Sequence, residues 1–157
     1  MNIKPWMDKQ EIEKIISYLH PEYKMFEWGC GGSTLYFSKY VYHYRSIEHD
    51  KAWFDKIIGL LPANVELYHV SNQNNYCEYI NAIHNYEDVY DCILIDGRCR
   101  VKCAIQAKPY LKNNGLLFVH DYYSRLYYHE IEKYYTLIDG IKNTEQTLAV
   151  FRNEIHN

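Results

Sequence analysis

Two kinds of hydrophobic pattern alternate along this chain. Short apolar runs such as KMFEW (24–28) and YDCILID (90–96) are followed by amphipathic runs in which apolar residues recur at helical spacing. The runs expected to be strands are 24–28, 44–48, 65–70, 90–96 and 115–121, and the runs expected to be helices are 33–40, 49–60, 75–84, 101–111 and 124–135. Five strand-then-helix units predict an α/β fold with a mostly parallel sheet and helices on both of its faces.

The two ends of the chain depart from this alternation. Apolar residues at helical spacing within 5–19, after Pro5, predict an opening helix. The segment 135–153 reads as two strands around a polar turn, which predicts an antiparallel hairpin at the sheet edge. We expect a single domain over residues 1–157, with the opening helix inside 1–21 and the α/β core in 22–157.

Composition narrows the class of protein. The chain has 157 residues, 48% hydrophobic and 24% charged, and a formal net charge of −3, which argues against nucleic acid as the main partner. The first residues carry charges throughout and lack an apolar segment, so we expect no signal peptide, no membrane partner and a cytoplasmic location. The five cysteines form no C-x-x-C pair and are expected to be reduced.

A glycine-rich stretch, EWGCGGST, joins the first expected strand to the helix after it. Glycines there allow a tight turn and let a ligand approach the backbone N–H groups. A dinucleotide fingerprint would need glycine or alanine at Thr34, and the acid Glu27 suits a cationic amine better than a pyrophosphate. The candidate cofactor residues of this stretch are Glu27, Trp28, Gly29, Gly31, Gly32, Ser33 and Thr34.

The next two strand ends carry further candidates for the same ligand. Glu48 ends the second strand a little under twenty residues past the glycines, where a βαβ unit places an acid near a ribose, and His49 follows it. After the third strand, Ser71 and Asn72 open a polar run that could meet the edge of an adenine. We therefore expect Glu48, His49, Ser71 and Asn72 to bind the cofactor.

Acids and cations gather after the fourth and fifth strands, in DGRCR and HDYYSR. Carboxyl ends of neighbouring parallel strands meet at one sheet edge, so these groups should share a cleft. We expect Asp96 and Gly97 to contact the cofactor. The candidate catalytic residues are Asp96, His120 and Asp121, and the candidate substrate-binding residues are Arg98, Arg125, Tyr122 and Tyr123.

The ordered set EWGCGGST, SIEHD, YDCILIDGRCR and GLLFVHDYYSR resembles class I S-adenosylmethionine-dependent methyltransferases over essentially the whole chain. Within it, DGRxR and HDYxxR resemble the sugar O-methyltransferase domain of glycan-synthesis proteins of large DNA viruses. The resemblance implies a Rossmann-like fold and S-adenosylmethionine as cofactor, with Glu27 near its methionine moiety and Glu48 on its ribose.

The same resemblance implies an acceptor and a setting for the reaction. The expected acceptor is a carbohydrate hydroxyl, for example on a deoxysugar such as rhamnose. The chain would then act in the cytoplasm, the host cytoplasm if it is viral, as one domain of a larger glycan-synthesis polypeptide.

Methylation of a hydroxyl needs help with proton removal, and two arrangements are open. In the first, His120 or Asp121 takes the proton, while Arg98 and Arg125 hold the acceptor or orient the acids. In the second, Asp96 and Asp121 hold a divalent cation, Mg²⁺ or Mn²⁺, as in catechol-type O-methyltransferases. Those enzymes place a third ligand directly after the second acid, where this chain has Tyr122.

Two rival functions stay open at this point. A nicotinamide-dependent oxidoreductase is disfavoured by Thr34 and Glu27 in the glycine-rich stretch. A non-catalytic cofactor-binding module would share the glycine-rich stretch but would not need the acids after the fourth and fifth strands.

Overall fold

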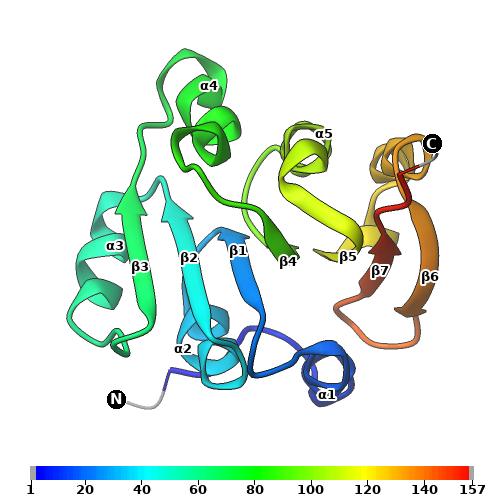
Figure 1. The fold of residues 1–157 in the computed structure, drawn as a ribbon, viewed down its shortest axis with the longest axis horizontal. Helices are drawn as coiled ribbons and strands as arrows, with labels where there is room; N and C mark the ends of the chain where they lie inside the picture. Colours follow the sequence, from blue (N-terminus) through cyan, green and yellow to red (C-terminus); the bar gives the residue numbers. More distant parts are fainter. Residues whose placement is uncertain (1–2, 156–157) are drawn as a thin grey trace.

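Seven strands form one sheet in the order β3-β2-β1-β4-β5-β7-β6 in a computed structural model that describes residues 3–155 (Figure 1). The strands are β1 (Lys24–Trp28), β2 (His43–Glu48), β3 (Val65–His69), β4 (Tyr90–Ile95), β5 (Leu111–His120), β6 (Thr136–Ile141) and β7 (Leu148–Arg152). β1 to β5 pair in parallel, which confirms the mostly parallel sheet. From β1 the chain adds strands toward one edge of the sheet, and from β4 it adds strands toward the other edge. The crevice in which open sheets bind ligands therefore lies at the carboxyl ends of β1 and β4.

The helices follow the expected alternation. They are α1 (Lys9–Tyr18), α2 (Gly32–Phe37), α3 (Lys51–Ile58), α4 (Gln73–Asn81) and α5 (Arg100–Ala107), with 3₁₀ helices η1 (Ser38–Tyr40), η2 (Ala82–Asn85), η3 (Lys108–Tyr110), η4 (Tyr122–Ser124) and η5 (Leu126–Lys133). Within residues 3–155, none of the helices has both the length and the apolar character needed to cross a membrane.

The C-terminal strands form the expected antiparallel pair. β7 pairs antiparallel with both β5 and β6, so the last strand enters between β5 and the edge strand β6. Register places Phe118 of β5 opposite Val150 of β7, and both side chains are buried. The hairpin therefore extends the core as well as ending the sheet.

Helices cover both faces of the sheet because strand side chains alternate between them. Trp28 of β1 belongs to a buried cluster that also contains Tyr79 of α4 and Ala104 of α5. Met25, three positions earlier on the same strand, packs in a second cluster with Ile15 of α1. The two apolar layers confirm the expected arrangement and explain why β1, β4 and β5 are nearly continuous in hydrophobic residues.

Some element boundaries differ from expectation. The opening helix begins at Lys9, after the N-cap Asp8. The run 124–135 forms the 3₁₀ helix η5 in place of an α-helix. A 3₁₀ helix aligns residues three apart, and this period brings both Tyr128 and Ile131 into the core. The start of α4 is irregular, because three consecutive residues from Asn74 to Tyr76 have positive φ angles.

The loops that follow β1 and β4 touch each other through their glycines. Gly29 has a φ of +95°, and a Cβ built on it would lie 2.8 Å from Cα of Gly97. A Cβ on Gly97 would in turn lie 2.0 Å from the Tyr79 hydroxyl. The carboxyl ends of the two central strands are thus held together by direct backbone contact, which needs glycine on both sides.

This contact gives the first prediction. Gly29→Ala should lower the free energy of unfolding by about 2–4 kcal/mol, because the new methyl group meets backbone and the φ angle is strained. The measurement is urea unfolding at constant pH. Gly59→Ala is the control, since nothing lies within 4 Å of a Cβ there and the change should be close to neutral. Equal stability of the two variants would contradict the close contact.

Candidate functional site

The glycine-rich loop is held from below by the buried carboxylate of Glu27. This side chain is fully buried and accepts hydrogen bonds from the hydroxyls of Ser33, of Thr34 at 2.6 Å and of Ser46 at 2.8 Å. Burial raises the pKa of Glu27 to about 7, although the three hydroxyl hydrogen bonds oppose the shift. The side chains of Glu27, Ser33 and Thr34 therefore fix the path of the loop, and the expected contact of Glu27 with the methionine moiety stays a prediction.

Two of the three expected cofactor glycines make room for protein backbone. Gly29 touches Gly97, and a Cβ on Gly32 would lie 1.9 Å from the carbonyl oxygen of Lys4. Gly31 is less crowded, since its Cβ would meet only the Trp53 ring, at 3.4 Å. The glycines are thus needed for the turn and for close chain packing, and Gly31 is the one of the three that no other backbone crowds.

Glu48 lies at the end of β2, beside this loop. Its Oε2 accepts from the Cys30 N–H at 3.0 Å and its Oε1 accepts from the Asp50 N–H at 2.8 Å. Asp50 itself caps α3 by accepting from the Trp53 N–H at 3.0 Å. The structure therefore places Glu48 at the expected position, next to the backbone that would cradle a nucleoside, with one oxygen anchoring the loop.

His49 follows Glu48 and faces two aromatic rings. Its ring lies edge-to-face with Tyr76 at 5.1 Å and with Tyr79 at 5.4 Å, and its buried Nδ1 has no hydrogen-bond partner among the described residues. Ser71 and Asn72 lie at the start of α4, where Ser71 Oγ accepts from the Gln73 N–H at 3.1 Å. The aromatic group around His49 is an environment in which a flat, nitrogen-rich ring could bind.

Asp96 and His120 are brought together as expected. Asp96 follows β4 and accepts from His120 Nδ1 at 2.7 Å, while the Asp96 N–H donates to the Trp28 carbonyl at 3.0 Å. The opposite ring nitrogen, Nε2, faces Oε1 of Glu11 at 3.4 Å. His120 is thus enclosed between a strand end and the opening helix.

The charge on His120 argues against its expected role as base. Burial alone would lower its pKa, but the contacts with Asp96 and Glu11 and the charge of Asp121 raise the pKa to about 10. The ring is therefore an imidazolium at neutral pH and has no free lone pair to take a proton. His120 orients the carboxylates around it.

Asp121 is the carboxylate that stays open. Its backbone has a left-handed φ of +55°, and its N–H donates to the Thr147 carbonyl at 2.6 Å. The side chain is 36% exposed, and its Oδ2 lies 3.7 Å from both His120 Nδ1 and Arg100 Nη1. Of the expected catalytic residues, Asp121 is the one with both exposure and spare acceptor capacity.

Arg100 was not among the candidate residues, yet it joins the two strand ends. Its Nε donates to the Gly97 carbonyl at 2.9 Å and its Nη1 donates to the His120 carbonyl. Its Nη2 also lies 4.0 Å from Asp96 Oδ1. The four-residue spacing between Asp96 and Arg100 was the available sequence signal, because it allows the arginine to fold back over the loop.

The two arginines expected to bind substrate, Arg98 and Arg125, are exposed. Arg98 follows β4 and Arg125 lies between η4 and η5. Within residues 3–155 the guanidinium groups of Arg98 and Arg125 make no hydrogen bond or ion pair, in contrast to Arg100 and Arg45. Their role toward an acceptor stays a prediction that their exposure permits.

Two expected ligand contacts through aromatic side chains need revision. Tyr122 is fully buried, donates to Glu132 Oε2 at 2.7 Å and stacks on His129 with ring centroids 4.8 Å apart, so it cannot form a sugar platform. Trp28 is also fully buried, and its Nε1 donates to the Tyr79 carbonyl at 2.8 Å, away from a ligand. Both rings belong to the same buried hydrophobic cluster and fill space in the core.

Tyr123 is partly buried and packs against the C-terminal hairpin. Its ring lies edge-to-face with Tyr122 at 4.9 Å and under the Lys142 ammonium at 4.8 Å. Its hydroxyl would lie 2.7 Å from a Cβ on Gly140 of β6. The ring therefore fills the space that Gly140 leaves, and the expected substrate contact of Tyr123 stays a prediction.

Asp96 and Asp121 do not fit the expected divalent-cation site as they are placed. Both carboxylates face the imidazolium of His120 and the guanidinium of Arg100, so two protein cations take the position between them. Over residues 3–155, no three His, Cys, Asp or Glu side chains are arranged to hold a metal ion. Mg²⁺ or Mn²⁺ would have to displace one of these cations.

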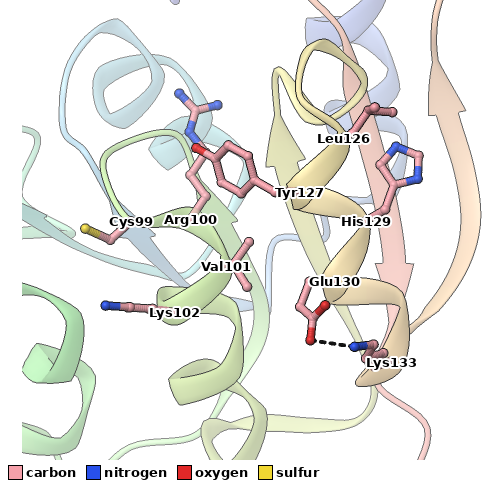
Figure 2. A pocket seen from close by; sticks show the side chains of 9 residues that line it. All are labelled: Cys99, Arg100, Val101, Lys102, Leu126, Tyr127, His129, Glu130 and Lys133. Atoms are coloured by element: carbon pink, nitrogen blue, oxygen red, sulfur yellow. Dashed lines mark hydrogen bonds and ion pairs between the residues drawn. The ribbon is translucent and has the colours of Figure 1, made fainter.

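A groove of about 650 Å³ opens beside the charged cluster, between α5 and η5. Figure 2 shows Val101 of α5 and Tyr127 of η5 facing its interior, with the Glu130 and Lys133 ion pair at one end. Leu126 and Tyr127 are 86% and 62% exposed, and Arg100 links the groove to Asp96 and Asp121. Asp96 and Asp121 do not line the groove, and its connection to the open carboxylate is the Arg100 guanidinium, whose Nη1 lies 3.7 Å from Asp121 Oδ2.

Comparison with known proteins identifies the architecture. No protein-family model matches the chain, and no curated protein sequence matches it. Among solved structures, a methyltransferase-like protein of Silicibacter pomeroyi superposes with a TM-score of 0.76 at 22% identity, over 98% of this chain and 90% of that one. An rRNA methylase of Streptococcus thermophilus gives a TM-score of 0.67 at 13% identity, over 95% and 99%.

A third similar structure contains a reaction product. The N-methyltransferase NodS of Bradyrhizobium japonicum, in complex with S-adenosylhomocysteine, gives a TM-score of 0.67 at 12% identity, over 96% of this chain and 88% of that one. The chain has the Rossmann-like fold of class I S-adenosylmethionine-dependent methyltransferases. At these identities the likeness concerns the fold, and the reaction must be argued from the site.

The buried Glu27 carboxyl gives a prediction about pH. With its pKa raised from 4.5 to about 7, the folded state binds a proton more tightly than the unfolded chain does. The contribution of the Glu27 carboxyl to the free energy of unfolding is therefore fully present below about pH 4.5, and it is lost as the pH rises through about 7. The free energy of unfolding of the wild type, relative to Glu27→Gln, should therefore fall by about 2–4 kcal/mol over this range.

The measurement is denaturant unfolding at several pH values for both proteins. Glu78→Gln, at an exposed position on α4, is the control and should follow the wild type at every pH. A difference between wild type and Glu27→Gln that does not change with pH would contradict the raised pKa.

Proposed function

We propose that this chain is an S-adenosylmethionine-dependent O-methyltransferase that acts on a carbohydrate hydroxyl. The observation that carries the proposal is the open carboxylate of Asp121, held at the strand ends of a methyltransferase fold beside two protein cations. The carboxylate of Glu48 and the glycine-rich loop lie at the same edge of the sheet. A base and a nucleoside site would thus be neighbours.

The cofactor part of the proposal is supported by the fit of the residues at β1 and β2. Glu48, whose side chain is 6% exposed, keeps spare acceptor capacity for ribose hydroxyls, since a carboxylate has about four acceptor positions and two are used. The aromatic rings of His49 and Tyr76 beside this loop would suit an adenine. S-adenosylmethionine would supply an activated methyl group there, and the protein would align the acceptor and exclude water.

Asp121 supports an oxygen acceptor. A hydroxyl must lose its proton as the methyl group arrives, and an exposed carboxylate at hydrogen-bond distance can receive it. His120 and Arg100 keep Asp121 in place by charge, at 3.7 Å each, without occupying it through a close hydrogen bond. In this scheme the proton would go to an Asp121 oxygen and the new bond would form between the acceptor oxygen and the methyl carbon. The bond from that carbon to the cofactor's sulfonium sulfur would break, and S-adenosylhomocysteine would be the leaving group.

A carbohydrate is favoured over a polyanion by the surroundings of Asp121. The groove between α5 and η5 offers the exposed ring of Tyr127, which can cover the C–H face of a sugar. The net charge of −3 disfavours RNA as an acceptor. The acceptor could be a deoxysugar such as rhamnose, presented on a larger glycan.

The cofactor and acceptor classes can be tested directly. Calorimetric titration should show binding of S-adenosylmethionine and S-adenosylhomocysteine and no binding of NAD. With a labelled methyl group, a panel of sugars, catechols, amines, nucleosides and RNA should show label in the sugars. Tight binding of NAD would contradict S-adenosylmethionine as the cofactor. Transfer of label to amines or RNA alone would contradict a carbohydrate as the acceptor.

Asp121→Asn tests the proposed base. Turnover should fall by about 10²–10⁴-fold, because the amide cannot take the proton, while the affinity for S-adenosylmethionine should stay within about twofold. Asp55→Asn, at an exposed position on α3, is the matched control and should keep full turnover. Exhaustive chelation should leave the wild-type rate unchanged; loss of activity that Mg²⁺ or Mn²⁺ restores would instead support the metal-dependent arrangement. Unchanged turnover in Asp121→Asn would contradict its role as the base, whereas absence of turnover in the wild type, with S-adenosylmethionine still bound, would favour a non-catalytic module.

A further inference from the structure

Glu11 has an environment that helix capping alone does not explain. It is the third residue of α1, and its Oε2 accepts from the Asp8 N–H at 2.7 Å, as in a capping box. Its side chain is nevertheless fully buried, whereas a capping residue needs only one oxygen and no burial. Burying a carboxylate costs several kcal/mol unless a cation accompanies it.

The cation that accompanies Glu11 is His120. Oε1 of Glu11 lies 3.4 Å from Nε2 of His120, and neither atom has a hydrogen-bond partner elsewhere among residues 3–155. His120 is 109 positions away in the sequence, at the end of β5. The two atoms are buried, belong to oppositely charged groups and face each other. A small shift of either side chain would give the contact hydrogen-bond geometry.

The opening helix is held firmly enough to make this contact specific. Farther along α1, Lys14 and Tyr18 donate to the Asp139 carboxylate of β6 at 3.0 Å and 2.7 Å. Ile15 of the same helix is fully buried against the sheet. The position of Glu11 relative to β5 is therefore set by packing and by a second ion pair at the other end of the helix.

Among residues 3–155, Glu11 is the one ion-pair partner of His120 that lies outside the proposed reaction centre. Asp96 from the end of β4 binds its Nδ1, Asp121 lies 3.7 Å from the same nitrogen, and the Arg100 guanidinium binds its carbonyl oxygen. Three carboxylates thus share two cations. Removing the charge of Glu11 would leave His120 free to turn toward Asp121 and compete for the open carboxylate.

We propose that Glu11 is a positioning residue of the methyl-transfer centre, which holds the charged His120 against Asp96 so that Asp121 stays open to the acceptor. The inference rests on the proposed function for its kinetic consequence. The contact itself can be tested without activity, so the two can fail separately.

Glu11→Gln is the appropriate variant. Glutamine also serves in a capping box, so the helix start is kept while the charge is lost. Glu13→Gln is the matched control, because Glu13 lies on the same helix, is exposed and, among residues 3–155, forms an ion pair with Lys9 alone, at 3.5 Å. Glu11→Asp keeps the charge with a shorter reach and serves as the second variant if the glutamine protein is unstable.

The first readout is NMR of the His120 imidazole as a function of pH. In the wild type and Glu13→Gln the ring should stay protonated well above neutral pH; in Glu11→Gln it should lose its proton at least tenfold more readily, and Glu11→Asp should lie between. Identical titration of His120 in all four proteins would overturn the proposal, whatever their activity.

The second readout is kinetic. In Glu11→Gln, kcat should fall about tenfold or more and its pH profile should shift, while KM for S-adenosylmethionine stays within about twofold and Glu13→Gln matches the wild type. An altered imidazole titration with unchanged kcat would overturn the positioning role. Absence of methyl transfer in the wild type would refute the proposed function and leave the NMR result to decide on the contact.

Discussion

The buried carboxyl of Glu27 is the group on which the geometry of the candidate site depends. It accepts from three hydroxyls, two on α2 and one on β2, and so ties β1 to the helix that follows it and to the neighbouring strand β2. Without side chains at Gly29, Gly31 and Gly32 the loop above it could take many paths. Because the hydroxyls of Ser33 and Thr34 are fixed from below, the loop takes one path and brings the Cys30 N–H to Glu48.

At the ends of β4 and β5, charged side chains rather than hydroxyl groups fix the geometry of the site. The ends of β4 and β5 bring Asp96 and Asp121 close together, α1 adds Glu11, and such a group of carboxylates is unstable unless cations are placed among them. His120 and Arg100 supply these cations, and the arginine also bonds the backbone of both loops. Asp121 is the carboxylate that this arrangement leaves exposed, so the requirement for charge balance also selects the candidate base.

The sequence predicted the order of elements and the strand-end residues well, because continuous apolar strands and glycine turns leave local signals. It could not separate rings that line a cleft from rings that fill the core. Tyr122 and Trp28 follow or end strands just as ligand-binding residues do, and only the packing of the C-terminal hairpin and of α4 shows that they are buried. Glu11 acts through His120, 109 positions away in the sequence, so no local pattern indicates the contact, whereas the spacing between Asp96 and Arg100 is a weak local signal for the role of Arg100.

The first residues of the chain also define which side of the site is open. The backbone at Lys4 packs on Gly32, and Glu11 reaches His120, so the segment before β1 covers the site from the α1 and α2 face. On the opposite face the groove between α5 and η5 leaves Leu126 and Tyr127 exposed. Cofactor geometry and charge balance are thus fixed by buried contacts, whereas the acceptor side consists of exposed side chains on a short 3₁₀ helix. Acceptor preference should therefore reside in η4 and η5, where residues can change without disturbing Glu27 or His120, and an open groove of this kind suits the end of a large molecule better than a small one that must be enclosed.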